Sequence, residues 1–264
     1  MSFEDKRLWK VTEEEFRRAF SIVRDTLLSE PVKRDHCAVL LGGQPGAGKS
    51  TLYRKRPDLR DYAIINGDSL RYYHPRCHEI GSADPSSFVA ATKEFCGKMM
   101  ETLIAELSLE GYNLVIEGTF RTIEIPVSTA RHLASLEYQT EISVLACDAE
   151  LAWRSNLTRA VLQKESGLYP RLLPLPLYDR IVTNLPEHLL SILQADRMSL
   201  FTSLSMYNRR GEGVLLPGDN PAGVLRKELD LSHWKAVYPI YEREYPLLYR
   251  DVFGKELSHD GMER

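Results

Sequence analysis

The stretch HCAVLLGGQPGAGKST, residues 36–51, carries the clearest indication of the fold. Its first half is a short apolar run that ends in glycine, which is typical of a strand buried on both faces of a parallel sheet. Its second half matches the pattern G-x-x-x-x-G-K-[S/T] from Gly43 to Ser50. A strand is expected before this loop and a helix after it, from about Lys49, so the stretch predicts a phosphate-binding loop.

The residue types of this loop have a physical reason. Successive backbone N–H groups point inward at a phosphate, which requires glycines that accept positive φ. We expect Lys49 to supply a cation for the β and γ oxygens of a nucleotide, and Ser50 a hydroxyl for Mg²⁺. The positive end of the following helix favours the same anion. The predicted nucleotide site comprises Gly43, Gln44, Pro45, Gly46, Ala47, Gly48, Lys49, Ser50 and Thr51.

Strands and helices are expected to alternate along the chain. Apolar runs predict strands at 36–43, 62–68, 112–117, 140–148 and 198–208. Helical periodicity predicts helices at 12–28, from 49, at 91–111, 125–138, 151–166 and 175–195, the last broken near Pro186. This order implies right-handed βαβ units. We therefore expect an α/β fold of the P-loop NTPase type, with a five-stranded, mainly parallel sheet flanked by helices on both faces.

We expect a single domain over residues 1–264, because no internal repeat or low-complexity linker divides the chain. Its core is expected over about 11–207, followed by a C-terminal helical extension over about 221–264. Five aromatic residues of the extension recur at helical spacing: Trp234, Tyr238, Tyr241, Tyr245 and Tyr249. This stripe predicts a helix that packs its aromatic face on the sheet, and an aromatic platform for a ligand is the alternative.

Composition excludes several classes of protein. The 264 residues carry a net charge of −3, without the basic excess of a nucleic-acid binder. No apolar stretch approaches the roughly 20 residues of a membrane-spanning helix, and the first twenty residues lack a signal-peptide core. Four scattered cysteines without a CxxC pair favour free thiols. We expect a cytoplasmic protein without a membrane or nucleic-acid partner.

A metal site is not expected around Cys77. His74 and His78 flank this cysteine, which suggests a metal-binding cluster at first sight. However, Pro75 breaks the helical register that would align the two imidazole rings.

Two acidic residues are expected at the ends of strands beside the loop. They are Asp68 in INGDSLRYYHP and Glu117 in VIEGTFR. Ligands of open parallel sheets bind at the carboxyl ends of the strands, so both carboxylates are expected to face the crevice of the loop. A carboxylate there can bind metal, polarise water or accept the proton of a substrate hydroxyl. The residues alone leave these roles open, and a helix cap or solvated loop residue is the structural alternative for each.

Arginines are the expected partners of a phosphate that carries developing charge. The candidates are Arg121, Arg154, Arg159 and Arg171. The segment ESGLYPRLLPLP around Arg171 is rich in glycine and proline, as a mobile lid would be. Exposed arginines are common, so the residues alone do not choose among the four.

These segments resemble the zeta toxin family, the kinase component of epsilon/zeta toxin–antitoxin systems, from about Val11 to Tyr207. The most specific pieces are LLGGQPGAGKS, NGD with HP six residues beyond Asp68, GYNLVIEGTFRT and DRIVTNLP. The resemblance implies a P-loop NTPase-type kinase that uses ATP and Mg²⁺. Its implied acceptor is the 3′-hydroxyl of the sugar in UDP-N-acetylglucosamine, a precursor of the cell wall. It also implies a small helical antitoxin that covers the ATP site.

The resemblance assigns roles to particular residues. Asp68 corresponds to the general base on the sugar hydroxyl, and Lys49 to the lysine of the phosphate loop. Arg159 and Arg171 correspond to lid arginines on the ATP phosphates, with Arg154 as the competing choice for the first. The residues that correspond to substrate contacts are Glu101, Glu117, Thr119, Arg121 and Thr129.

Some alternatives stay open at this point. Phe120 stands where the family has small residues, and a large ring there can reshape the sugar pocket. The acceptor can be another UDP-sugar, or a drug or nucleoside phosphorylated on the same scaffold. A nucleotide-gated interaction module, which binds ATP without transferring phosphate, is the alternative from a different class.

Overall fold

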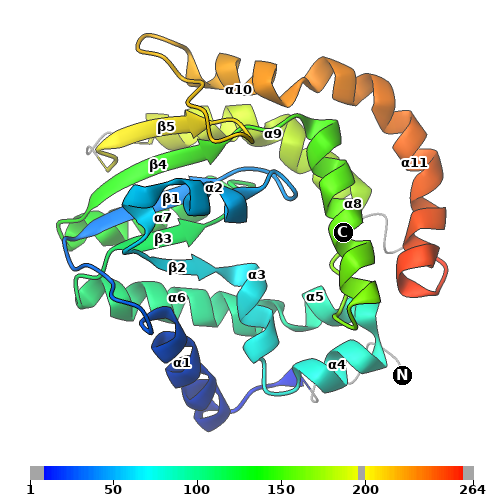
Figure 1. Cartoon of the computed structure of the whole chain (residues 1–264), viewed down its shortest axis with the longest axis horizontal. Helices are drawn as coiled ribbons and strands as arrows, with labels where there is room; N and C mark the ends of the chain where they lie inside the picture. The colour runs from blue at the N-terminus through cyan, green and yellow to red at the C-terminus, as the bar shows by residue number, and fades with distance from the viewer. Residues whose placement is uncertain (1–8, 196–199, 258–264) are drawn as a thin grey trace.

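The computed structural model describes residues 9–195 and 200–257. Within these residues, five strands form one sheet in the order β2–β3–β1–β4–β5, and every neighbouring pair is parallel. The predicted α/β fold with a five-stranded parallel sheet is confirmed (Figure 1). The strands are β1 Cys37–Gly42, β2 Ala63–Asn66, β3 Leu114–Glu117, β4 Gln139–Leu145 and β5 Ser203–Tyr207.

Helices connect the strands and continue beyond the sheet. The α-helices are α1 Glu13–Leu27, α2 Lys49–Lys55, α3 Gly67–Leu70, α4 Cys77–Ala83, α5 Phe88–Ala91, α6 Lys93–Leu109, α7 Glu124–Ser135, α8 Ala149–Glu165, α9 Leu175–Gln194, α10 Pro221–Leu229 and α11 Leu231–Phe253. Short 3₁₀ helices are η2 Pro57–Leu59, η3 Arg71–Tyr73 and η4 Pro85–Ser87. Strand β5 begins later than expected, and 198–199 lie outside the described residues. In the described part of the chain, no helix is long and apolar enough to cross a membrane.

Strand β1 shows why the sheet is buried on both faces. Ala38 and Leu40 belong to a core that includes buried residues of α1, α6 and α7. Val39 and Leu41 point the other way, into a second core with buried residues of α2, α8 and α11. Side chains alternate between the two faces of a strand, so a continuous apolar run fits a sheet covered on both sides.

Strands β2 and β4 end more than one residue earlier than the sequence predicts. Strand β2 stops at Asn66, and Asp68 lies in the first turn of α3 instead of ending the strand. The side chain of Asn66 accepts a hydrogen bond from the Asp68 backbone N–H at 2.9 Å, which starts the helical turn. Strand β4 stops at Leu145, and Asp148 instead caps α8 by accepting from the Leu151 N–H at 2.7 Å.

The predicted break near Pro186 is wrong, because α9 runs continuously from Leu175 to Gln194. A proline inside a helix removes one backbone hydrogen bond and costs about 3 kcal/mol. Around it, Val182, Leu185 and Leu189 are fully buried between α9 and its neighbours. Burial of large apolar side chains contributes about 1.5–3 kcal/mol each, which outweighs the cost of the proline.

The C-terminal aromatic stripe lies on one helix, α11, as predicted, but it packs on α8 and α9 and not on the sheet. The Trp234 ring centroid lies 5.3 Å from that of Tyr178 in α9. Those of Tyr241 and Tyr245 lie 6.4 and 6.1 Å from that of Trp153 in α8. Helices α8 and α9 already cover this face, so α11 forms a further layer outside them (Figure 1).

Phe120 is only 5% exposed and belongs to the core beside α6 and α7. Its backbone has φ +50°, a left-handed conformation that only a few per cent of non-glycine residues adopt. A Cβ placed on Gly42 at the end of β1 would overlap the Phe120 ring. The ring therefore packs into space that the glycine leaves free.

This packing predicts that Gly42→Ala destabilises the fold by about 1–3 kcal/mol, the usual cost of overpacking a core. The loss is measured by urea denaturation. Adding Phe120→Leu should recover part of it, because the smaller side chain gives the methyl group room. Gly97→Ala in α6 is the matched control, since nothing lies within 4 Å of its Cβ position. The control should gain about 1 kcal/mol from helix propensity, and equal losses in both variants would contradict the packing argument.

Candidate active site

The glycine loop between β1 and α2 adopts the conformation that a phosphate cradle needs. Gly43, Gly46 and Gly48 all have positive φ, of 141°, 82° and 103°. A Cβ on Gly43 would lie 2.7 Å from the Leu145 carbonyl oxygen, and one on Gly46 would collide with that of Ala152. These glycines are therefore required both by their backbone angles and by the close approach of β4 and α8.

Lys49 closes the loop from the first turn of α2. Its buried ammonium group donates to the carbonyl oxygens of Gly43 at 2.8 Å and Gln44 at 3.2 Å. The Glu117 carboxylate at the end of β3 lies 4.0 Å from Nζ. Burial lowers the pKa of Lys49 and raises the pKa of Glu117, since both charged groups are removed from water. Additional anionic partners would therefore favour the charged lysine.

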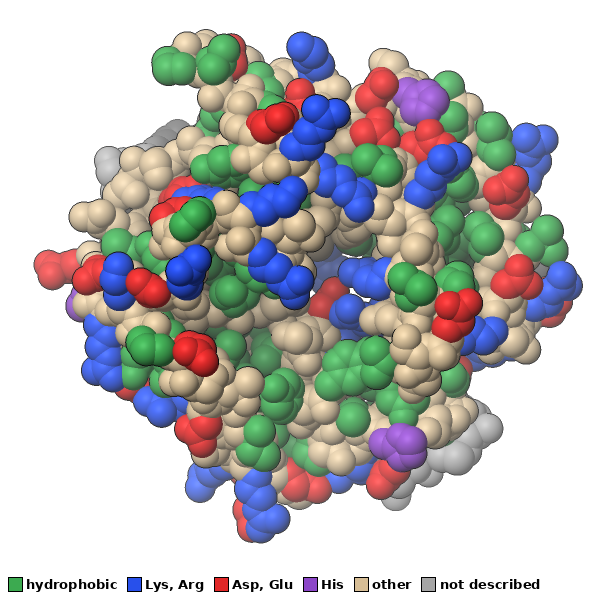
Figure 2. Space-filling model, viewed as in Figure 1, with side chains coloured by type: hydrophobic (Ala, Val, Ile, Leu, Met, Phe, Trp, Pro, Cys, Tyr) green, Lys and Arg blue, Asp and Glu red, His purple; other side chains and the backbone are tan. Residues whose placement is uncertain are grey.

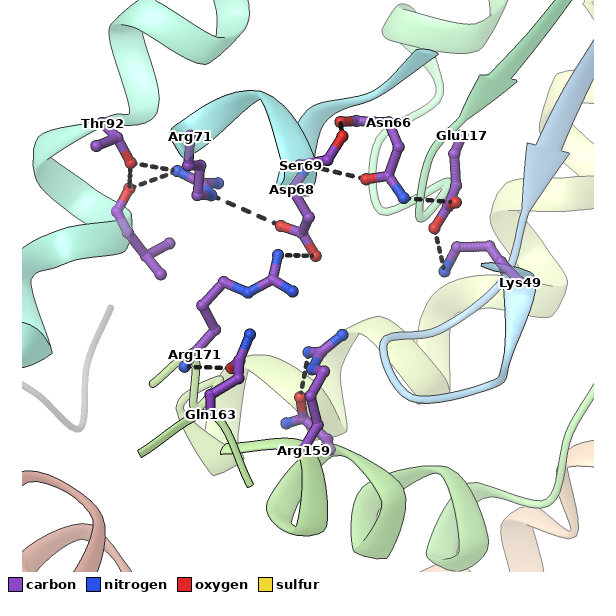
Figure 3. Close-up of polar contacts among 12 residues, drawn as sticks. Lys49, Asn66, Asp68, Ser69, Arg71, Thr92, Glu117, Arg159, Gln163 and Arg171 are labelled. Carbon is purple, nitrogen blue, oxygen red and sulfur yellow. Dashed lines mark hydrogen bonds and ion pairs between the residues drawn. The ribbon is translucent and has the colours of Figure 1, made fainter. Parts of the chain in front are cut away.

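Asn66 joins the two acidic residues that the sequence predicted. Its Nδ2 donates to Glu117 Oε2 at 2.8 Å, while its Oδ1 accepts from the backbone N–H of Asp68 at 2.9 Å. Figure 3 shows Lys49, Glu117, Asn66 and Asp68 in a row across the carboxyl ends of β1, β3 and β2. Both acids therefore lie beside the loop, and Asp68 reaches this place from a helical turn.

Asp68 is surrounded by cations. Its Oδ2 lies 3.0 Å from Arg171 NH1, and its Oδ1 lies 3.6 Å from Arg71 Nε (Figure 3). Burial alone would raise the pKa of Asp68, but Arg171, Arg159, Arg71 and Lys49 together lower it below its usual value. The carboxylate is therefore ionised and able to accept a proton, and its side chain keeps 48% of its surface exposed to the cleft.

The two predicted lid arginines approach from the opposite side of the cleft. Arg159 extends from α8, where its NH2 donates to Asn156 Oδ1 at 2.7 Å. Arg171 belongs to the lid segment, residues 166–174 between α8 and α9, and its backbone N–H donates to Gln163 Oε1 at 3.0 Å. In both, the buried Nε has no hydrogen-bond acceptor among the described residues. These donors can bind an anion in the cleft.

Arg154, the competing lid arginine, faces elsewhere. Its Nε donates to the Tyr241 hydroxyl of α11 at 2.9 Å and lies 3.2 Å from Glu150. Two-thirds of its side-chain surface is exposed. The geometry therefore favours Arg159 of the two.

The remaining predicted residues lie on α2, α6 and α7 and in the loop after β3. Arg121 and Glu101 are exposed, after β3 and on α6, and neither forms an ion pair with Asp68 or Glu117. Thr119 and Thr129 are half-buried, the first in the loop after β3 and the second on α7. At the start of α2, the side chains of Ser50 and Thr51 are exposed.

The lid segment is held against the opposite wall by Tyr169. Its hydroxyl contacts His78 Nδ1 of α4 at 2.6 Å, and its ring centroid lies 4.9 Å from that of Phe88 in α5. A Cβ on Gly81 would overlap the Tyr169 ring, so glycine leaves the space that the ring occupies. This contact places the lid across the cleft between the loop and α3.

A cavity of about 470 Å³ adjoins the loop between α8 and the segment after β5. It is lined by Arg159 and Gln163 on one side and by Arg209 on the other. The Arg209 Cγ is 3.8 Å from the Cβ position of Gly48, and its NH1 donates to Ser155 Oγ at 2.7 Å. Lys and Arg side chains surround the hollow at the centre of Figure 2.

Sequence reasoning missed three residues of this site. Asn66 and Arg71 flank Asp68 in the chain, and the capping preference of asparagine before a helical turn was a usable signal for the first. Arg209 follows β5 in MYNRRGEGVL, and nothing local in the sequence relates it to the loop.

The histidines near Cys77 have structural partners. His74 is buried, its Nδ1 accepts from the Arg76 backbone N–H at 3.1 Å, and its Nε2 lies 3.3 Å from the Trp9 carbonyl oxygen. His78 is engaged with Tyr169. Among the residues that the structure describes, no group of three or more His, Cys, Asp or Glu side chains forms a metal site.

A parallel sheet in this strand order, with a glycine loop after its central strand and lysine and arginine side chains facing Glu117 and Asp68, defines a P-loop protein of the kinase-like class. Residues 23–220 match the sequence model of the Zeta toxin family. The chain belongs to the zeta toxin family, as the resemblance of its motifs predicted.

Individual relatives agree with this assignment. Toxin PezT of Streptococcus pneumoniae is 32% identical over 232 residues, which cover 86% of this chain and 90% of the relative. Toxin zeta of Streptococcus pyogenes is 31% identical over 214 residues, which cover 78% of this chain and 74% of the relative. A solved structure from the PezAT toxin–antitoxin system of Streptococcus pneumoniae superposes with a TM-score of 0.72 at 28% identity. That match covers 92% of this chain and 98% of the solved chain.

Proposed function

We propose that this protein transfers the γ-phosphoryl group of ATP to the 3′-hydroxyl of the sugar in UDP-N-acetylglucosamine. The product is withdrawn from cell-wall synthesis, which makes the protein toxic to the cell that contains it. Both substrates are cytoplasmic metabolites, so we place the reaction in the cytoplasm. The observation that carries the proposal is the ion pair of Arg171 with Asp68 at 3.0 Å, opposite the phosphate loop, whose Lys49 faces Glu117 (Figure 3).

The positions of these groups support phosphoryl transfer. The loop and Lys49 lie on one side of the cleft, and the two arginines lie opposite, each with N–H donors that find no acceptor among residues 9–195 and 200–257. Cations fixed on both sides of a transferring phosphate neutralise the charge that develops on its oxygens. Asp68, between them, is ionised and partly exposed, as a group that receives a proton must be.

The proposed reaction balances as follows. The sugar O3′ attacks the γ-phosphorus, a new O–P bond forms, and the bond from the γ-phosphorus to the bridging oxygen of ADP breaks. Asp68 accepts the proton of the attacking hydroxyl, and ADP leaves with the electron pair of the broken bond. We assign Arg159 and Arg171 to the phosphate oxygens, and Glu117, Thr119 and Arg121 to the sugar nucleotide. Glu101 and Thr129 stay more distant substrate contacts in this proposal.

The loop fits a magnesium nucleotide. Its three glycines have the positive φ that turns backbone N–H groups toward a phosphate, and the 470 Å³ cavity beside Arg209 offers room for the nucleoside. We assign the exposed hydroxyl of Ser50 to Mg²⁺. When bound, this ion neutralises charge on the phosphate oxygens.

We further propose a small helical antitoxin as the protein partner. The relative from Streptococcus pneumoniae belongs to a toxin–antitoxin system, and the match to its chain is nearly complete. A partner that covers the phosphate loop would compete with ATP, so added Mg-ATP should weaken the complex.

The substrate proposal predicts that UDP-N-acetylglucosamine stimulates ADP release from Mg-ATP, and that the sugar nucleotide gains one phosphate. Each compound of a panel of UDP-sugars, nucleosides and aminoglycosides is incubated with the protein, and the products are resolved by mass spectrometry. The 3-deoxy analogue of the sugar is the matched control and should give no product. If only another compound stimulates ADP release, that compound replaces UDP-N-acetylglucosamine as the acceptor. If none does, the kinase proposal is overturned.

A further inference from the structure

Two arginines contact different oxygens of Asp68, and they are held in different ways (Figure 3). Arg171 comes from the lid segment, and its guanidinium forms an ion pair with Asp68 itself, at 3.0 Å. If Arg171 binds phosphate, as the proposed function requires, this contact is exchanged for one with the nucleotide. The question is which group then holds the carboxylate in place.

Arg71 is anchored to the wall of the cleft. Its NH1 donates to the Val89 carbonyl oxygen at 2.8 Å and to Thr92 Oγ1 at 2.9 Å. Thr92 is fully buried between α5 and α6, and its hydroxyl donates to the Phe88 carbonyl oxygen at 2.7 Å. Only 13% of the Arg71 side chain is exposed. These contacts fix the guanidinium independently of the lid.

The remaining edge of this guanidinium faces the catalytic carboxylate. Arg71 Nε lies 3.6 Å from Asp68 Oδ1, and no described residue gives this buried N–H a hydrogen-bond acceptor. A small rotation of Asp68 would form the bond. The oxygen involved is the one that Arg171 does not contact, so both contacts coexist in this structure.

We propose that Arg71 is a positioning residue, which orients the Asp68 carboxylate toward the acceptor hydroxyl and remains on it when Arg171 moves to the phosphates. The inference rests on the proposed kinase function, which assigns Asp68 to the acceptor. It adds a fixed cation to a site in which the other cations bind the donor nucleotide.

Several charged and titratable groups face Asp68. The cations are Arg171, Arg159, Arg71 and Lys49, and the other groups are Glu117, Tyr72 and Cys96. The cations lower the pKa of Asp68 against the effect of burial. Removing Arg71 should therefore raise this pKa, and the change should be largest when Arg171 is occupied by nucleotide.

The test compares Arg71→Gln, Arg71→Lys and Arg18→Gln, the last a matched control on an exposed arginine of α1. We expect Arg71→Gln to lower kcat about 10–100-fold, a usual loss when a reacting group is misplaced by less than 1 Å. The acid limb of the pH profile of kcat/KM should move up by about one unit, because Asp68 loses a cation. Arg71→Lys keeps the charge but not the planar guanidinium, so it should restore the position of the acid limb more fully than it restores kcat. In both Arg71 variants, KM for ATP should not change.

A second readout does not depend on activity. With ¹³C-labelled aspartate, the Asp68 carboxyl signal is assigned by its loss in Asp68→Asn, and its titration midpoint is followed by NMR. We expect a higher midpoint in Arg71→Gln than in wild type. If Arg71→Gln does not fold, Thr92→Val removes one anchor of Arg71 at constant shape and should move the midpoint less. An unchanged midpoint overturns the inference.

These readouts separate the inference from the proposed function. A wild-type kcat and acid limb in Arg71→Gln, with activity abolished in Asp68→Asn, would overturn the role of Arg71 and leave the kinase intact. If the wild type transfers phosphate to no acceptor, but the Asp68 midpoint is higher in Arg71→Gln than in wild type, the kinase proposal is overturned and the contact between Arg71 and Asp68 is retained.

Discussion

Asp68→Asn is expected to lower kcat for phosphoryl transfer by about 10²–10⁴-fold, the usual contribution of a general base. Asparagine keeps the shape of the side chain but cannot accept the proton of the acceptor hydroxyl. ATP should bind as well as before or more tightly, since Arg171 loses its carboxylate partner at 3.0 Å. The measurements are initial rates with saturating acceptor and the ATP affinity by calorimetry.

Asp219→Asn is the matched control for this substitution. Asp219 is exposed in the loop before α10, where its carboxylate accepts from the Leu216 N–H at 2.8 Å. We expect wild-type rates for this variant. If expression of the wild type arrests growth without an antitoxin, Asp68→Asn should relieve the arrest. An Asp68→Asn variant that retains its biological effect would instead support an interaction module that never transfers phosphate.

Lys49→Met is expected to lower kcat/KM for ATP by at least about 10²-fold, the usual cost of removing one preorganised charge donor at a transferring group. The stabilisation that Mg-ATP gives the wild type in thermal unfolding should disappear as well, because it requires nucleotide binding. Lys55→Met, at the end of α2, is the control with an exposed lysine. A Lys49→Met variant that Mg-ATP still stabilises fully would contradict the assigned role.

The stability of Lys49→Met should also depend on pH. Without Lys49, the carboxylate of Glu117 is left in the site without the cation that lies 4.0 Å away, at a cost of about 1–3 kcal/mol at neutral pH. Burial already raises the folded-state pKa of Glu117, and loss of Lys49 raises it further. The folded variant then binds a proton more tightly than the unfolded chain, so its stability relative to wild type should recover as the pH falls toward about 5. Lys49→Met with Glu117→Gln should show little of this pH dependence.

Patterns within single elements were predictable from the sequence, because their causes are local. The apolar run before Gly43 predicts a strand, and the three glycines of the loop indeed take the positive φ that the motif requires. Helix α1 begins with Thr12 and Glu15 exchanging hydrogen bonds, a capping pair visible in the sequence.

Errors arose where neighbours in space outweigh local preference. Pro186 does not break α9, since the buried face of the helix outweighs the lost hydrogen bond. The packing of the Phe120 ring into the space beside Gly42 likewise depends on a neighbour in space. The aromatic stripe lies on one helix, α11, as its periodicity predicted. Periodicity does not say which surface the stripe packs against.

The sequence by itself determined the donor half of this site, because one continuous segment, residues 43–51, contains the turn, the lysine and the hydroxyl that a nucleotide phosphate needs. Only the tertiary structure decided which groups face that segment. Asp68, Arg71 and Arg171 meet because parallel strands bring their carboxyl ends together and Tyr169 places the lid across them. Contacts between residues so distant in the chain depend on the packing of whole elements, and no local pattern encodes that packing.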